Sequence, residues 1–121
     1  MSDYAGFSEA RASFSFDRLD HLREVGFSRD EIHSIVGPRR TLARREGGAA
    51  LSLVEADRVE RLERISELAD RVFGDHEKAA RWLRKEVRSL NGARPIELLR
   101  SETGAHHVEQ ALLRIDHGIF A

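Results

Sequence analysis

Proline is scarce in this chain of 121 residues, and no segment alternates apolar and polar residues for long enough to indicate a strand. The two prolines are Pro38 and Pro95. Because a proline inside a helix removes a hydrogen bond and clashes with the preceding turn, their scarcity leaves room for long helices. Apolar residues recur at the three- and four-residue spacing of helices that bury one face. The sequence therefore predicts an all-α fold.

Capping motifs and glycines mark where these helices begin and end. Two capping boxes, in which a Ser and a Glu each satisfy the other's backbone N–H, indicate helix starts at Ser28 and Ser52. Glycines end helices because they adopt the left-handed conformation without strain. We expect helices over 17–25, 28–36, 38–46, 53–73 and 76–87, a turn at Asn91-Gly92, a short helix from Pro95, a break at Thr103-Gly104 and a last helix to Ile115.

Charge and composition exclude several classes of protein. The chain has 20 Lys and Arg against 21 Asp and Glu, so any affinity for nucleic acid must come from a local patch. Without cysteine it has no disulfide, no thiolate metal site and no cysteine nucleophile. No run of roughly 18 apolar residues is present to span a membrane, and the first residues lack the apolar core of a signal peptide. We expect a soluble, cytoplasmic protein with no membrane partner.

The segment 28–46 has the pattern of two helices joined by a short turn, and its second helix is rich in arginine. In helix-turn-helix proteins the second helix lies in the major groove, where arginine contacts both phosphates and guanine. A solvated basic face on an ordinary helical hairpin is the alternative. The candidate DNA-binding residues are Arg39, Arg40, Thr41, Arg44 and Arg45.

No arrangement of residues indicates catalysis, a metal site or a cofactor site. Ser28 and Ser52 are accounted for as helix caps, and Gly47-Gly48 lacks the spacing and the following Lys of a phosphate-binding loop. His106 and His107 are adjacent, so a regular helix directs them to different faces and they cannot bind one ion together. We expect a protein that is not an enzyme, with no catalytic residue, no cofactor and no metal.

The last residues of the sequence are apolar. Such an end is usually polar or frayed, so exposed Ile and Phe indicate docking into another surface. Packing on the chain's own core is the alternative. The candidate interface residues are His117, Gly118, Ile119, Phe120 and Ala121.

Several motifs, taken in order, resemble the toxin-binding domain of Xre/MbcA/ParS-type antitoxins. They are Val72-Phe73-Gly74-Asp75, Ala79-Ala80-Arg81-Trp82-Leu83, the run from Leu90 to Leu99, Glu102-Thr103-Gly104-Ala105, Val108-Glu109 and the run from Leu113 to Phe120. Residues 28–46 resemble the helix-turn-helix of the same family, so the resemblance covers residues 17–121. Arg94 stands where the family often has a threonine, which removes a side-chain N-cap worth roughly 1 kcal/mol.

The resemblance implies a function. Antitoxins of this family bind and silence a RES-domain toxin that degrades NAD, and they bind operator DNA, usually as dimers, and repress their own operon. The toxin is occluded by the C-terminal domain, whose end lies close to the toxin's active site; here that end is His117 to Ala121. A stand-alone helix-turn-helix transcriptional regulator without a toxin partner is the alternative, and a helical adaptor that has lost DNA binding is a third.

The same resemblance implies a domain organisation and a set of partners. We expect a flexible arm over residues 1–15, a helix-turn-helix region for DNA binding and dimerisation over 16–51, and a toxin-binding domain over 52–121. The expected partners are a RES-domain toxin in a type II toxin–antitoxin system, operator DNA and a second copy of the chain. We also expect the dimer to join the toxin in a higher-order toxin–antitoxin complex.

Overall fold

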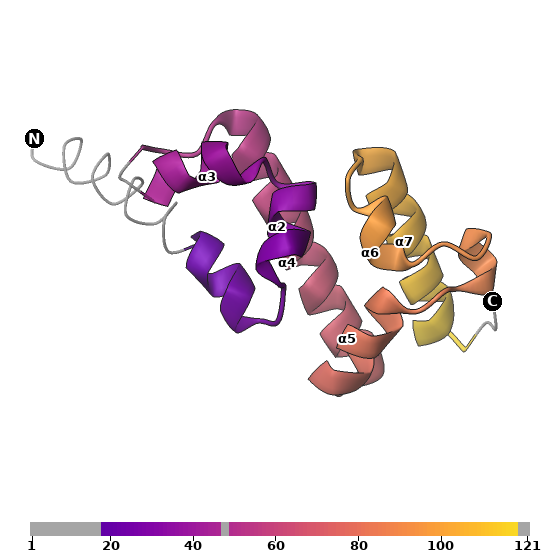
Figure 1. The fold of residues 1–121 in the computed structure, drawn as a ribbon. Helices are drawn as coiled ribbons and strands as arrows, with labels where there is room; N and C mark the ends of the chain where they lie inside the picture. The colour runs from indigo at the N-terminus through magenta and orange to yellow at the C-terminus, as the bar shows by residue number, and fades with distance from the viewer. Residues whose placement is uncertain (1–17, 47–48, 119–121) are drawn as a thin grey trace, which may run out of the picture. The chain divides into compact units, whose positions relative to one another are not determined.

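The computed structural model describes residues 18–46 and 49–118, and all regular secondary structure in them is helical (Figure 1). The prediction of an all-α fold is therefore confirmed. The chain forms two compact units, one up to Glu60 and one from Arg61 onwards. The helices in chain order are residues 18–24, α2 (Arg29–Ile35), α3 (Arg39–Glu46), α4 (Leu53–Phe73), α5 (His76–Arg84), the 3-10 helix η1 (Arg88–Leu90), α6 (Pro95–Leu98) and α7 (Glu102–Asp116).

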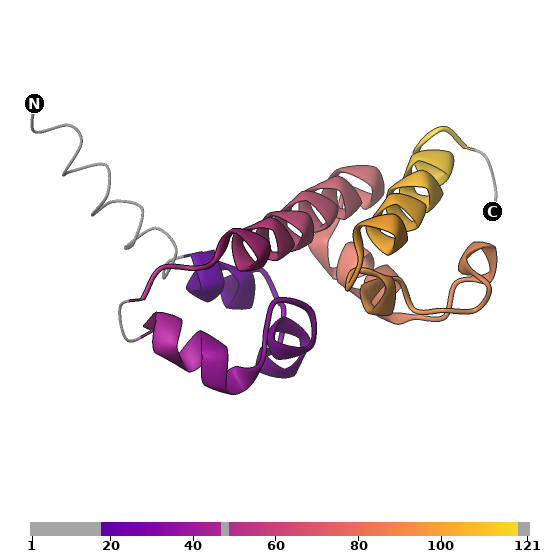
Figure 2. The same cartoon turned by 90° about the horizontal axis from the view of Figure 1, so that it is seen from above.

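The N-terminal unit packs helical residues 18–24, α2, α3 and the first part of α4 around one apolar core (Figure 2). Both predicted capping boxes form. Ser28 and Glu31 exchange hydrogen bonds of 2.9 and 3.1 Å at the start of α2, and Ser52 and Glu55 exchange bonds of 2.8 and 3.1 Å at the start of α4. The buried apolar side chains are Leu19, Leu22, Phe27, Ile32, Ile35, Val36, Leu42 and Val59.

The C-terminal unit contains α5, α6 and α7, and α6 contacts both of the others (Figure 1). Asp75 caps α5, its side chain accepting a hydrogen bond from the backbone N–H of Glu77. Trp82 is only 7% exposed and its ring lies 5.8 Å from that of Phe73, so it anchors the core of this unit. The other buried apolar side chains are Leu62, Ile65, Ala69, Ala79, Leu83, Val87, Leu90, Ile96, Leu99, Ala105, Val108, Ala111 and Leu112.

The helix that we expected over residues 76–87 is shorter than predicted and ends at Arg84. The backbone adopts an extended conformation at Lys85. The N–H of Val87 then donates a hydrogen bond of 3.1 Å to the carbonyl of Ala93. That bond closes the loop that contains the predicted turn at Asn91-Gly92, whose residues both have positive φ. A hydrogen bond across a loop, which the local sequence does not encode, therefore ends the helix early.

Gly104 lies in the first turn of α7, so the predicted break at Thr103-Gly104 is wrong. Ser101 caps this helix, and its Oγ accepts a hydrogen bond of 2.9 Å from the backbone N–H of Gly104. A Cβ atom at Gly104 would overlap the backbone carbonyl of Leu98. The glycine therefore permits a close approach of two backbone segments rather than the end of a helix.

We predict that Gly104→Ala lowers the free energy of unfolding by about 1–3 kcal/mol, the usual cost of overpacking. The atom in the way is a backbone oxygen, which cannot swing aside as a flexible side chain would. Thr103→Ala, at the exposed neighbouring position, is the control and should change stability by less than about 0.5 kcal/mol. Urea unfolding followed by circular dichroism measures both variants, and native stability of Gly104→Ala would contradict the close approach.

Candidate functional site

Helix α3 carries three exposed arginines, Arg39, Arg40 and Arg44, and has no acidic residue in its first turn. Arg40 and Arg44 are four positions apart and so lie on one face of the helix. Arg39 pairs with Asp30 at 3.5 Å, but both side chains are largely exposed, and such pairs contribute little to stability. Thr41 is partly buried on the same helix. The start of α3 thus presents a concentrated positive charge.

Arg45, the fourth arginine of α3, makes a structural contact inside the N-terminal unit. Its Nε and Nη2 atoms lie 2.8 and 3.3 Å from the two carboxylate oxygens of Glu55. The two side chains are only 19% and 8% exposed. Because Glu55 also accepts the backbone N–H of Ser52 at 2.8 Å, one carboxylate both caps α4 and holds α3 against it. Arg45 is therefore less available to a partner than the other three arginines.

The carboxyl group of Glu55 has a pKa below its ordinary value. Burial by itself would raise this pKa, but the hydrogen bonds from Arg45 and from Ser52, together with the positive charge of Arg45, lower it by more. A carboxyl group whose pKa is lower in the folded than in the unfolded state stabilises the fold at pH values above its unfolded pKa. That contribution is lost as the pH falls through the folded pKa.

The candidate residues at the end of the sequence follow α7 directly. After α7 ends at Asp116, both His117 and Gly118 are exposed. Gly118 has a φ of 75°, in the left-handed region that glycine adopts without strain, so the chain changes direction there. The candidate residues that lie outside the described part of the chain are Ile119, Phe120 and Ala121.

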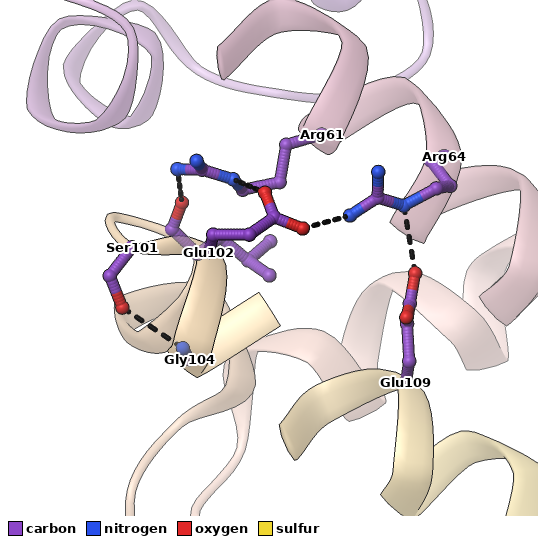
Figure 3. A network of polar contacts seen from close by, with 7 residues as sticks. Arg61, Arg64, Ser101, Glu102, Gly104 and Glu109 are labelled. Carbon is purple, nitrogen blue, oxygen red and sulfur yellow. Dashed lines mark hydrogen bonds and ion pairs between the residues drawn. The ribbon is translucent and has the colours of Figure 1, made fainter. Parts of the chain in front are cut away.

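A network of ion pairs fixes α7 against α4 (Figure 3). Arg61 donates from Nε to Glu102 and from Nη1 to the carbonyl of Leu99, both at 3.1 Å. Arg64 bridges Glu102 and Glu109 at 3.0 and 2.7 Å. Arg61 is only 8% exposed, so this contact lies within the packed unit. The base from which His117 and Gly118 extend is thus held in one position.

Sequence reasoning missed this network, although a partial signal was present. Arg61 and Arg64 are three positions apart, and Glu102 and Glu109 are seven apart, so each pair shares one helix face. Which faces meet depends on the packing of distant segments.

Burial by itself would raise the pKa of Glu102, but the two arginines outweigh it and the pKa is lowered.

Within residues 18–46 and 49–118, no group of three or more His, Asp and Glu side chains is placed to hold a metal ion. The rings of His106 and His107 lie edge to face, with centroids 6.4 Å apart. None of the described helices combines the length and the apolar composition that crossing a membrane requires.

Comparison with known proteins identifies relatives of both halves of the chain. Residues 68–118 match the family described as the antitoxin Xre/MbcA/ParS C-terminal toxin-binding domain. A protein named Antitoxin Xre from Pseudomonas putida is 33% identical over 118 residues, which cover 97% of this chain and 74% of the relative. Proteins of the same name from Photorhabdus laumondii and Yersinia enterocolitica are 34% and 31% identical, covering 77% and 92% of this chain and 65% and 78% of the relatives.

We predict that Glu55→Gln, which keeps the shape but removes the charge, lowers the free energy of unfolding at pH 7 by about 2 kcal/mol. The difference from the native chain should begin to shrink below the unfolded pKa of about 4.3 and disappear as the pH falls through the lower folded pKa, where the native carboxylate becomes protonated. Glu60→Gln, at an exposed position of the same helix, is the control. Urea unfolding at several pH values measures this, and a difference that does not change with pH would contradict the assigned ion pair.

Proposed function

Because the chain belongs to the Xre/MbcA/ParS family of antitoxins, we propose that it is the antitoxin of a type II toxin–antitoxin system that inhibits a RES-domain, NAD-degrading toxin. The observation that carries this proposal is the toxin-binding domain matched over residues 68–118. Inhibition by covering the toxin requires no catalytic group, cofactor or metal in the antitoxin. The two proteins meet in the cytoplasm, where the NAD and the DNA are.

The inhibitory segment in this proposal is His117 to Ala121. A toxin that consumes NAD needs a cleft with donors for the dinucleotide's phosphates and apolar walls for its rings. Ile119 and Phe120 supply apolar side chains that suit such walls. Because α7 is held on α4 by Arg61 and Arg64, the segment starts from a fixed base, which reduces the entropy lost on binding.

Repression of the chain's own operon is the second part of the proposal, with α2 and α3 as the helix-turn-helix. Arg39, Arg40, Thr41 and Arg44 would face the operator, and the exposure of the three arginines supports this role. Arg45 contributes by holding α3 in place through Glu55. The assignment of DNA binding to a region that ends at residue 51, and of toxin binding to a domain that begins at residue 52, stays a prediction.

We propose that the chain is a homodimer joined through its N-terminal half, and that this dimer enters the higher toxin–antitoxin complex. Leu53 and Val54, at the start of α4, are 82% and 56% exposed, which is costly for two large apolar side chains unless a partner covers them. A dimer also places two recognition helices about one DNA turn apart. Light scattering of the isolated chain should give a dimer that Leu53→Glu dissociates; a monomer for the native chain at micromolar concentration would contradict this.

We predict that Arg39→Ala/Arg40→Ala abolishes operator binding in a gel-shift assay and leaves toxin neutralisation intact. Each lost phosphate contact should also reduce the slope of log affinity against log salt by about one. Arg71→Ala/Arg81→Ala removes the same charge from exposed positions of the C-terminal unit and is the matched control. Unchanged promoter affinity of the α3 variant would assign DNA binding to another surface.

We predict that deletion of residues 118–121 abolishes rescue of cells that express the RES-domain toxin, while the shortened chain still folds and binds DNA. The reason is that the deletion removes the apolar side chains and leaves the α4–α7 network untouched. Circular dichroism and the gel-shift assay are the controls for folding and DNA binding. Full rescue by the shortened chain would move the inhibitory surface to residues 76–115.

A further inference from the structure

A cavity of about 230 Å³ in the N-terminal unit gathers arginine side chains from three helices. Arg23 comes from helical residues 18–24, Arg29 is the first residue of α2 and Arg39 is the first residue of α3. Within the part of the chain that the structure describes, the side chains of Arg23 and Arg29 make no hydrogen bond and no ion pair. The packing of three helices thus lines one cavity with three arginines, and among the described residues only Arg39 of the three is paired with a carboxylate.

The charge around this cavity is strongly one-sided. Asp20 is the one acidic residue among those that line it, against three arginines. Arg39 also has Asp30 within 3.5 Å, but that carboxylate is 91% exposed and does not line the cavity. A cavity lined mainly by one sign of charge attracts ions of the opposite sign. The cavity is therefore suited to a negatively charged ligand.

Two further features of the cavity define what kind of anion it suits. His33 is another lining residue, and its imidazole adds a polar ring to the lining. Leu19, Ile32 and Leu42 form an apolar floor, each no more than 6% exposed. A ligand with both an anionic head and an organic body matches this combination of surfaces.

We propose that this cavity binds a phosphate ester, with its phosphate held by Arg23, Arg29 and Arg39 and its organic part on the apolar floor. Guanidinium groups bind phosphate through paired hydrogen bonds, and a phosphate offers more oxygens and more charge than a carboxylate to the three arginines that line the cavity. The phosphate comes from the DNA backbone or from a small phosphorylated compound. The inference depends on neither the toxin nor the operator, because inorganic phosphate alone can test the site.

The test follows the arginine Nε–H signals of the isotopically labelled full chain by NMR while phosphate is added at constant ionic strength. The signals of Arg23 and Arg29 should shift saturably, and Arg23→Gln/Arg29→Gln should weaken binding about tenfold or more. The matched control is Arg71→Gln/Arg81→Gln, which removes the same charge from exposed positions of the C-terminal unit that do not line the cavity. Retained amide shifts in the C-terminal unit and in α2 show that each variant is folded.

A second arm of the same experiment identifies the source of the phosphate. A short DNA duplex of arbitrary sequence should shift the same two signals, with inorganic phosphate competing, if the backbone is the ligand. A shift with inorganic phosphate and a nucleoside monophosphate but not with the duplex assigns the site to a small compound. The proposal is overturned if no probe gives a saturable shift, or if the control variant loses as much affinity as the cavity variant.

Discussion

The buried guanidinium of Arg61 is the contact on which the C-terminal unit depends. It donates to the carbonyl of Leu99 and to the carboxylate of Glu102, and it is only 8% exposed. An arginine keeps its charge at any physiological pH, so it can be buried only where such acceptors meet it. Packing that failed to bring α7 to this point of α4 would leave a charge unpaired. The contact therefore fixes α7, and with it the position from which His117 and Gly118 extend.

The N-terminal unit uses the same principle in a second place. Arg45 pairs with Glu55, whose carboxylate also completes the capping box at the start of α4, just as Glu102 is the first residue of α7. In both units a carboxylate near a helix start accepts an arginine from another segment, where the helix dipole also favours a negative charge. One arginine of α3 is paired internally while Arg39, Arg40 and Arg44 are exposed, which is compatible with the DNA-binding role proposed for this helix.

Sequence patterns predicted what is locally encoded and failed where distant segments meet. The capping boxes at Ser28 and Ser52 and the bounds of α4 depend on residues a few positions apart, so they were read correctly. The end of α5 depends on a hydrogen bond across a loop, and the role of Gly104 depends on the carbonyl of Leu98 at the end of α6. For the same reason the arginines of α3 could be found in the sequence, whereas the partner of Arg45 and the cavity lined by three helices could not.

In the proposed function, the toxin is bound by the C-terminal unit and DNA by α2 and α3. Hydrogen–deuterium exchange of the full chain, alone, with the RES-domain toxin and with operator DNA, tests it most directly, because it reports protection along the whole backbone. We expect the toxin to protect the end of α7 and the residues after it while leaving Arg29 to Glu46 unchanged, and we expect DNA to do the reverse. Protection of α3 by the toxin, with none at the end of α7, would contradict it.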